Sequence, residues 1–336
     1  MRTTRHTLLA LSLLLLVPSC KRITLHESEG NLHVDLQINL KMDISVSSDL
    51  NLDANPALKE KVEGKKPEWL RACFYDTVTH KLVAEDFISA DGGFVNVPGG
   101  TYDVIIYNLG NEATQLAGTE TRAGAYAFTS AEGTRVKVTK TKADNTEETT
   151  EYEVVNEPDH LLVGRMEGLV VPDESAQDRS VNIGAQLASL LETFTFEVST
   201  VTGGEHIASA EVYITDQALG RYLWDGRYVS RPCAMHVPAV VDPDKGVLYT
   251  VFNTFGKYPD STSEVYLNVQ VVGESGGRYQ WTYDVTEQVT NPDNTSKAIV
   301  INEPMEVPDD SDPSSGGGFQ PSVTEWNSEI IEIPLF

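Results

Sequence analysis

Residues 32 to 46 constrain the fold most strongly, because apolar and polar side chains alternate there without a break. The apolar members are Leu32, Val34, Leu36, Ile38, Leu40, Met42, Ile44 and Val46. Strict alternation puts the apolar side chains on one face of a β-strand, whereas a helix would scatter them around its axis. We therefore predict a long strand over residues 32–46, which is either bent or shared between two sheets.

The rest of the chain repeats this period in shorter runs that are separated by turn residues. The clearest pair alternates from Val265 to Val271 and again from Tyr279 to Val285, with a glycine-rich turn between the two runs. Short strands every 8–15 residues, with almost no amphipathic helix, are typical of β-sandwiches. We expect an all-β chain, and its 336 residues have room for about two domains.

Two segments have helical character. Asn55 as N-cap, Pro56 at the first position and Gly64 as the stop predict a short surface helix. The spacing of Ile183, Leu187, Leu190 and Leu191 predicts one further helical turn. Residues 172–180 are polar and rich in turn formers, so we place a boundary there, with domains over residues 31–172 and 173–336.

The first twenty residues carry an export signal. A basic start at residues 2–6 precedes an apolar run from Leu8 to Val17. A membrane-spanning helix needs about 20 apolar residues, so this run indicates a secretory signal instead. It ends in Val17-Pro18-Ser19-Cys20, which resembles the bacterial lipobox. That resemblance implies removal of residues 1–19, a lipid such as palmitate on Cys20, and a tether over residues 20–30. A plain signal peptide with a chance cysteine is the alternative.

Charge and cysteine content narrow the remaining possibilities. The formal net charge is −25, and nucleic-acid binding needs the opposite sign, so a nucleic-acid partner is excluded. Cys73 and Cys233 could pair in an oxidising compartment. They lie in apolar settings far apart in the chain, which favours two small buried thiols.

The sequence offers no convincing active site. Gly273-Glu274-Ser275-Gly276-Gly277 matches G-x-S-x-G, but a nucleophile elbow needs a following helix and a strand follows here, so we predict a hairpin turn. The acidic segments 242–246 and 309–312 lack the glycine and glutamate of a calcium loop and are interpreted as turns. Trp224 is a weak candidate for stacking on a sugar. We predict no catalytic, cofactor-binding or metal-binding residues and no enzyme activity.

Three features together resemble the fimbrillin-like lipoproteins of the Bacteroidetes, which include type V pilus subunits, anchors and accessory proteins. They are the lipobox Cys20, the segment Val97-Pro98-Gly99-Gly100-Thr101-Tyr102-Asp103-Val104-Ile105-Ile106-Tyr107-Asn108, and the ending Gly316-Gly317-Gly318-Phe319 with Trp326. The resemblance implies two tandem transthyretin-like (Greek-key) β-sandwich domains and an outer-membrane lipid anchor.

The resemblance also implies a mode of assembly. In polymerising members a protease cuts after an arginine near the first strand, and the vacated groove accepts a neighbour's strand, which is β-augmentation. This chain has no arginine between Arg22 and Arg71, so the first strand should stay in place. The terminal segment 329–336 either donates a strand or completes its own domain.

Three functions follow in order of preference. The first is a lipid-anchored fimbrial anchor or accessory subunit in adhesion, whose partners are the membrane, through Cys20, and pilus subunits of the same family. The second is a stand-alone surface lipoprotein that binds a glycan or another ligand. The third is a hydrolase. A clustered His/Asp/Ser site in a pocket would favour the third, and an exposed aromatic platform the second.

Overall fold

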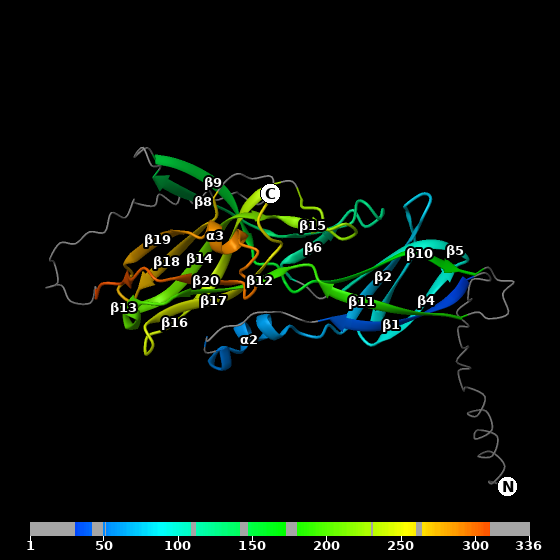
Figure 1. The fold of residues 1–336 in the computed structure, drawn as a ribbon, viewed down its shortest axis with the longest axis horizontal. Helices are drawn as coiled ribbons and strands as arrows, with labels where there is room; N and C mark the ends of the chain where they lie inside the picture. The colour runs from blue at the N-terminus through cyan, green and yellow to red at the C-terminus, as the bar shows by residue number, and fades with distance from the viewer. Residues whose placement is uncertain are drawn as a thin grey trace, which may run out of the picture.

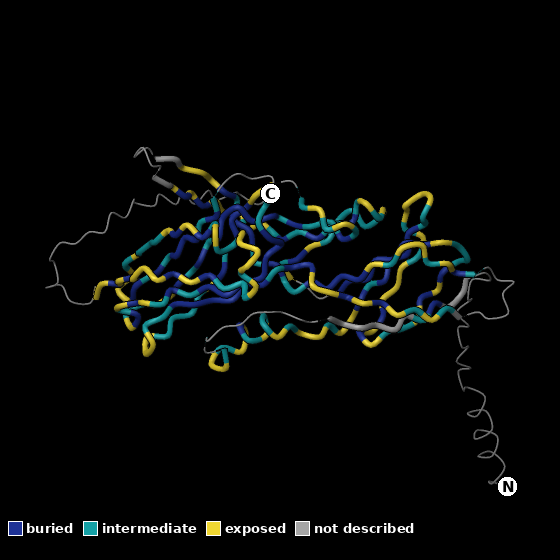
Figure 2. Tube along the Cα trace, in the orientation of Figure 1, coloured by how far each residue is buried: buried dark blue, intermediate teal, exposed yellow. Residues whose placement is uncertain are grey.

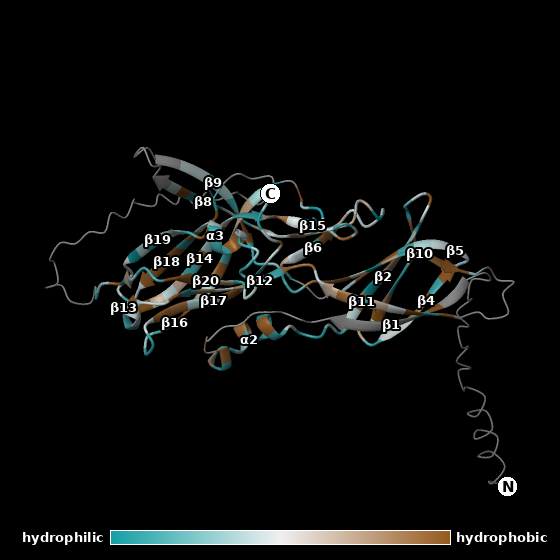
Figure 3. Ribbon diagram, viewed as in Figure 1, coloured by the Kyte–Doolittle hydropathy of each residue, from teal (hydrophilic) through white to brown (hydrophobic). Residues whose placement is uncertain are grey.

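The computed structural model describes residues 31–41, 50, 52–108, 112–141, 147–172, 180–229, 231–259 and 264–309. These residues are mostly in β-strands, which confirms the predicted β class. Figure 1 shows two β bodies arranged along the longest axis of the molecule. Buried residues run through the centre of both bodies, and exposed residues gather at the loops and rims (Figure 2). Hydrophobic and hydrophilic positions follow one another along many of the strands (Figure 3).

The first body is a closed barrel of seven strands in the order β1-β11-β10-β5-β2-β3-β4. Its core is lined by aliphatic and aromatic side chains of alternate strand positions, such as Leu70, Phe74 and Val95, all almost fully buried. The strands are β1 (Asn31–Lys41), β2 (Trp69–Asp76), β3 (Leu82–Ser89), β4 (Gly92–Pro98), β5 (Gly100–Asn108), β10 (Leu162–Val171) and β11 (Ser180–Ser189).

The second body is a nine-stranded sheet with the main order β19-β18-β14-β16-β17-β12-β20, to which the β8–β9 hairpin is added. The strands are β8 (Ala131–Thr141), β9 (Glu147–Asn156), β12 (Glu192–Val198), β14 (Ile207–Ala218), β16 (Pro232–Asp242), β17 (Val247–Thr254), β18 (Tyr266–Gly273), β19 (Arg278–Asp284) and β20 (Ala298–Ile301).

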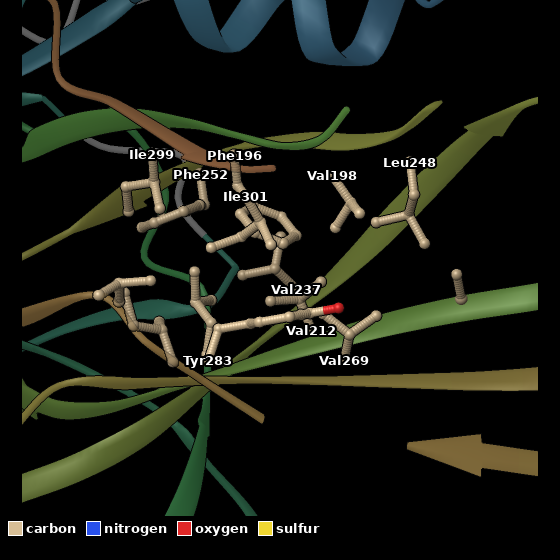
Figure 4. Close-up of a cluster of buried hydrophobic side chains, with 14 of the residues drawn as sticks. Phe196, Val198, Val212, Val237, Leu248, Phe252, Val269, Tyr283, Ile299 and Ile301 are labelled. Atoms are coloured by element: carbon tan, nitrogen blue, oxygen red, sulfur yellow. The ribbon is translucent and has the colours of Figure 1, made fainter. Parts of the chain in front are cut away.

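The sheet of the second body curls because β16 changes partners along its length. Its first part pairs with β14, and its last three residues pair with β17. The two arms of the sheet therefore enclose one core, in which Phe196 and Val237 are fully buried and Phe194 and Phe252 stack with ring centroids 5.7 Å apart. Figure 4 shows side chains from both arms pointing toward one another in this core.

The remaining elements cover or connect the two bodies. A three-stranded sheet has the order β15-β7-β6, and β13 pairs with β21. These elements are β6 (Thr114–Ala117), β7 (Tyr126–Thr129), β13 (Val201–Thr202), β15 (Gly220–Tyr222), β21 (Met305–Glu306), the α-helices α2 (Pro56–Glu63) and α3 (Thr286–Thr290), and the 3₁₀-helices η2 (Leu52–Ala54) and η3 (Gly204–His206).

The predicted helical turn near Leu187 is wrong, because strand β11 occupies that position. Ala185 and Leu187 face the barrel core, and Leu190 and Leu191 follow after the strand ends. The strand pairing of the two bodies crosses residue 172 in both directions. Strand β11 follows this residue and lies in the barrel, whereas β9 precedes it and pairs with β16 of the second body. The boundary at 172/173 therefore stays a prediction of the sequence.

Candidate interaction site along the first strand

Strand β1 closes the barrel between β4 and β11. Residues 33–41 pair in parallel with residues 180–188 of β11, and residues 31–37 pair antiparallel with residues 92–98 of β4. Residues 33–37 are therefore paired on both sides. The predicted first strand is confirmed over residues 31–41, and its remainder, 42–46, lies outside the described residues.

The face that β1 covers is apolar. Val34 is fully buried opposite Val95 of β4, which is also buried, and Val97 and Leu187 lie in the same core cluster. Because alternate residues of a strand share one face, removal of β1 would expose an apolar groove between β4 and β11. The backbone groups along both sides of that groove would then lack their strand partner, which is the geometry that accepts an added strand.

The chain continues from β1 to α2, which packs on the outside of β17 in the second body (Figure 1). Leu58 is buried there in a cluster with Tyr249 and Val251. The helix begins at Pro56 and is followed by Gly64 at φ 71°, as predicted. Asn55 does not cap the helix with its side chain. Its amide instead donates a hydrogen bond of 2.5 Å to the Tyr249 hydroxyl.

Lys61 fixes α2 to the second body through a charged contact. Its Nζ lies 2.5 Å from Glu157 Oε2 and donates a second hydrogen bond of 3.0 Å to the carbonyl of Val251. Glu157 also accepts a hydrogen bond of 2.8 Å from the backbone N–H of Asn253. Burial raises the pKa of Glu157 above its ordinary value, and Lys61 opposes that rise. Strand β1 therefore belongs to the first body, whereas α2, the next α-helix along the chain, is held on the second.

The three-stranded sheet provides a second connection, because β15 and β7 pair across a large sequence distance. It covers the outer face of β2 and β5, where Tyr75 and Tyr107 are buried. Trp224 packs at this cluster, and the Arg122 guanidinium lies 4.5 Å from the centre of its ring. Arg122 also pairs with the buried carboxylate of Asp103. One face of Trp224 is thus already occupied by a cation.

The other residues singled out from the sequence have structural surroundings. Cys73 and Cys233 are both free and buried, in agreement with the favoured interpretation. Burial raises the pKa of the Cys73 thiol to about 11 and that of Cys233 to about 12, so neither is a reactive thiolate. Cys20 lies outside the described residues.

The G-x-S-x-G segment is the predicted hairpin turn. It joins β18 to β19, the Gly273 N–H donates a 2.7 Å hydrogen bond to the Gly277 carbonyl, and Gly276 has φ 91°. Residues 242–246 form the turn between β16 and β17, where Asp242 accepts a hydrogen bond from the Lys245 N–H. Across the described part of the chain, no three His, Cys, Asp or Glu side chains are grouped to hold a metal ion.

Sequence reasoning missed the contacts that attach α2 to the second body. Lys61 is one of several lysines in a charged segment, and Glu157 lies in an irregular connection between strands. No local pattern distinguishes either residue from a solvated side chain. The two residues are 96 positions apart in the sequence, and only the tertiary fold brings them together.

No helix in the described ranges is both long and apolar enough to span a membrane. The fold and the site define a β-rich protein of two bodies, in which strand β1 closes the first body and helix α2 packs on the second. The chain belongs to the family described as "Domain of unknown function (DUF5119)", whose model matches residues 59–236.

Relatives named as fimbrial proteins and adhesins of the Bacteroidetes confirm the resemblance seen in the sequence. The "Putative fimbrium anchoring subunit Fim4B" of Bacteroides ovatus is 24% identical, and the alignment covers 100% of both chains. The crystal structure of a "putative adhesin" from Bacteroides ovatus has a TM-score of 0.55 at 19% identity and covers 87% of this chain and 100% of its own. The structure of the fimbrial anchor protein Mfa2 of Porphyromonas gingivalis has a TM-score of 0.47 at 12% identity and covers 80% of this chain and 89% of its own.

Proposed function

We propose that the protein is a lipid-anchored fimbrial anchor or accessory subunit of the outer membrane, which acts in adhesion through strand-mediated contacts with pilus subunits. The relatives named as fimbrial anchors and adhesins support the class of function. The lipobox at Cys20 supports the mode of attachment. Several acyl chains on one cysteine give a stable anchor, since each buried CH₂ contributes about 0.8 kcal/mol.

The observation that carries the proposal is the position of β1. This strand is paired with both β4 and β11, and its sequence lacks the arginine at which the first strand of polymerising relatives is cut. An uncut first strand keeps the lipid attached to the folded body. It also keeps the groove filled, so the protein would end an assembly instead of accepting a further subunit at this groove.

The proposal includes the finer architecture that the resemblance implies. The two bodies would be variants of two tandem transthyretin-like sandwich domains. The mature chain would start at Cys20 and carry its lipid on a tether over residues 20–30. It would have no catalytic role, as the names of its relatives suggest.

The anchor is tested by changing the lipid-bearing cysteine. Cys20→Ala should release the protein from the membrane fraction of the native bacterium and remove incorporated radiolabelled palmitate. Lys21→Ala keeps the cysteine and is the matched control. Retention of Cys20→Ala in the membrane at the level of the control would contradict the lipid anchor.

The pilus assignment is tested by mass spectrometry of sheared surface filaments and of the membranes left behind. Recovery with filaments or filament bases, with residues 31–41 intact, supports an anchor. Recovery only as free lipoprotein contradicts it and favours the stand-alone ligand-binding alternative. The structure gives that alternative little support at Trp224, because Arg122 already lies over its ring.

A further inference from the structure

Three large aromatic side chains are exposed together on the outer wall of the barrel. Trp69 of β2, Phe87 of β3 and Phe94 of β4 have exposed fractions of 56%, 58% and 62%. Isolated exposed apolar residues are common, but a contiguous group marks a surface that meets a partner or a membrane. We call these three residues the aromatic patch.

Strand register explains why the three residues share one surface. Trp69 pairs with Ser89, and Arg71 pairs with Phe87, so Trp69 and Phe87 are diagonal neighbours on the same face. Ser89 pairs with Gly92 across the next hairpin, and Phe87 and Phe94 lie two residues from that pair on either strand. The residue that follows each of them in the sequence, Leu70, Ile88 and Val95, is buried in the barrel core, so the patch points outward.

Two ion pairs lie beside the aromatic patch. Arg71 Nη2 lies 2.5 Å from Glu85 Oε2, and the Arg71 guanidinium is 6.0 Å from the centre of the Phe87 ring. Lys66 pairs with Asp91 in the hairpin between β3 and β4. Asp35 pairs with Phe94 across β1 and β4, and the exposed Glu68 and Asp86 precede Trp69 and Phe87 in the sequence, so the patch is an apolar area bordered by carboxylates. Such a surface can approach zwitterionic lipid headgroups, which carry no net charge to repel the carboxylates.

We propose that the aromatic patch rests in the headgroup region of the membrane that holds the lipid on Cys20 and so fixes the orientation of the barrel on the membrane. The inference rests on the proposed lipid anchor. The eleven-residue step from Cys20 to Asn31 can span at most about 36–40 Å. Phe94 pairs with Asp35, four residues beyond Asn31, which adds roughly 13 Å along the strand.

The short tether is the reason for proposing the membrane as the partner of the aromatic patch. The anchored lipid cannot be farther from the patch than the tether allows, so the membrane surface is always within its reach. Tryptophan and phenylalanine side chains bind at membrane–water interfaces, where an amphipathic surface can bury its apolar side. A single attachment through Cys20 leaves the barrel free to rotate, whereas a second contact at the patch restricts it.

The test couples the mature chain, which begins at Cys20, to phosphatidylcholine vesicles that contain a maleimide lipid. Cys73 and Cys233 are buried with raised thiol pKa values, so coupling should occur at Cys20. Two vesicle preparations are compared, and the acyl chains of one are brominated, because bromine quenches tryptophan that lies at the interface. The Trp69 signal is obtained by subtracting the emission of Trp69→Phe measured under the same conditions.

We expect the Trp69 emission to be quenched in the brominated vesicles and the quenching to be lost in Phe87→Ser/Phe94→Ser. Phe87→Ser alone should lose part of it. Val300→Ser removes an exposed apolar side chain of the second body and should leave the quenching unchanged. All these substitutions are at exposed positions, so circular dichroism should show an unchanged fold.

Two outcomes would overturn the proposal. One is an unquenched Trp69 in the coupled protein. The other is concentration-dependent self-association without vesicles, measured by sedimentation and abolished by Phe87→Ser/Phe94→Ser, which would make the patch an interface between copies. The chemical coupling does not depend on lipidation in the cell. Palmitate labelling of Cys20 therefore tests the anchor separately, and its failure would not change the vesicle result.

Discussion

Replacement of Lys61 by methionine should weaken the attachment of α2 to the second body at neutral pH. The substitution keeps the length of the side chain but removes the charge that lies 2.5 Å from Glu157 Oε2. Glu157 would then keep one hydrogen bond, from the N–H of Asn253, and would lose the one cation that pairs with it among the described residues. The carbonyl of Val251 would lose a donor as well.

The expected loss follows from the burial of the pair. Removal of one member of a fully buried ion pair costs about 3–5 kcal/mol, because the other charge stays desolvated. Here the side chains of Lys61 and Glu157 are 23% and 14% exposed, so water screens them in part. We expect Lys61→Met to lower the free energy of unfolding by about 2–3 kcal/mol at neutral pH.

The loss should depend on pH in a defined direction. Burial raises the pKa of Glu157 above its ordinary value of 4.5, while Lys61 lowers it. Removal of Lys61 therefore raises that pKa further. An acid whose folded pKa is raised favours folding below its ordinary pKa, and this contribution is lost as the pH rises through the folded pKa. The difference between Lys61→Met and the wild type should thus shrink as the pH falls toward about 4.

Urea unfolding, followed by tryptophan fluorescence at several pH values, measures this difference. Lys59→Met is the matched control, because Lys59 lies on the same helix and pairs with the exposed Asp53; it should change little. Lys61→Met/Glu157→Gln should recover part of the loss, since the uncompensated charge is gone. A Lys61→Met variant as stable as Lys59→Met at neutral pH, or a loss that does not change with pH, would refute the reasoning.

Two further predictions concern the second body. Phe196 is fully buried in the core of the curled sheet, and Phe196→Ala should cost about 3–5 kcal/mol in the free energy of unfolding, measured by urea denaturation; a cost below about 1 kcal/mol would show that this core repacks freely. His236 Nδ1 lies 2.8 Å from Glu132 Oε1, and this hydrogen bond raises the pKa of His236 above its ordinary value of 6.5. The resulting stability is complete below that ordinary value and is lost as the pH rises through the folded pKa. The urea midpoint of the wild type should therefore fall between about pH 6 and pH 8, and that of His236→Gln should fall less. An equal fall in both proteins would contradict this assignment.

Local patterns predicted the elements that local physics determines. Alternation in residues 32–41 identified β1, Pro56 and Gly64 bounded α2, and the glycine-rich segment 273–277 was assigned to a turn. In each case the signal lies within the element itself. The helical spacing around Leu187 misled because Leu190 and Leu191 belong to a different contact region, beyond the end of β11.

Partner choice could not be predicted in this way. Alternation shows which face of β1 is buried, but it does not show that β11, about 140 residues later, lies beside it in parallel. The same holds for β15 beside β7 and for β9 beside β16. The candidate site consists of such long-range pairings, and for this reason the sequence predicted an uncut first strand without predicting what holds it. The exposure of the aromatic patch was likewise invisible, because the alternation that puts Leu70 and Ile88 inside the barrel cannot show whether another element covers the outer face.

The attachment of α2 bears directly on the proposed role of β1. A strand can leave the barrel only if the chain at one of its ends is free to move with it. The end of β1 at Lys41 leads to α2, which Leu58, Asn55 and Lys61 hold on the second body. The other end leads back to Cys20, which the proposed lipid holds at the membrane. Exchange of β1 for a neighbour's strand would therefore require a cut, and residues 23–70 contain no arginine, the residue after which the fimbrillin-like resemblance implies that polymerising members are cut. The contacts of α2 and the missing cleavage site act in the same direction, since each keeps the groove filled by the protein's own strand.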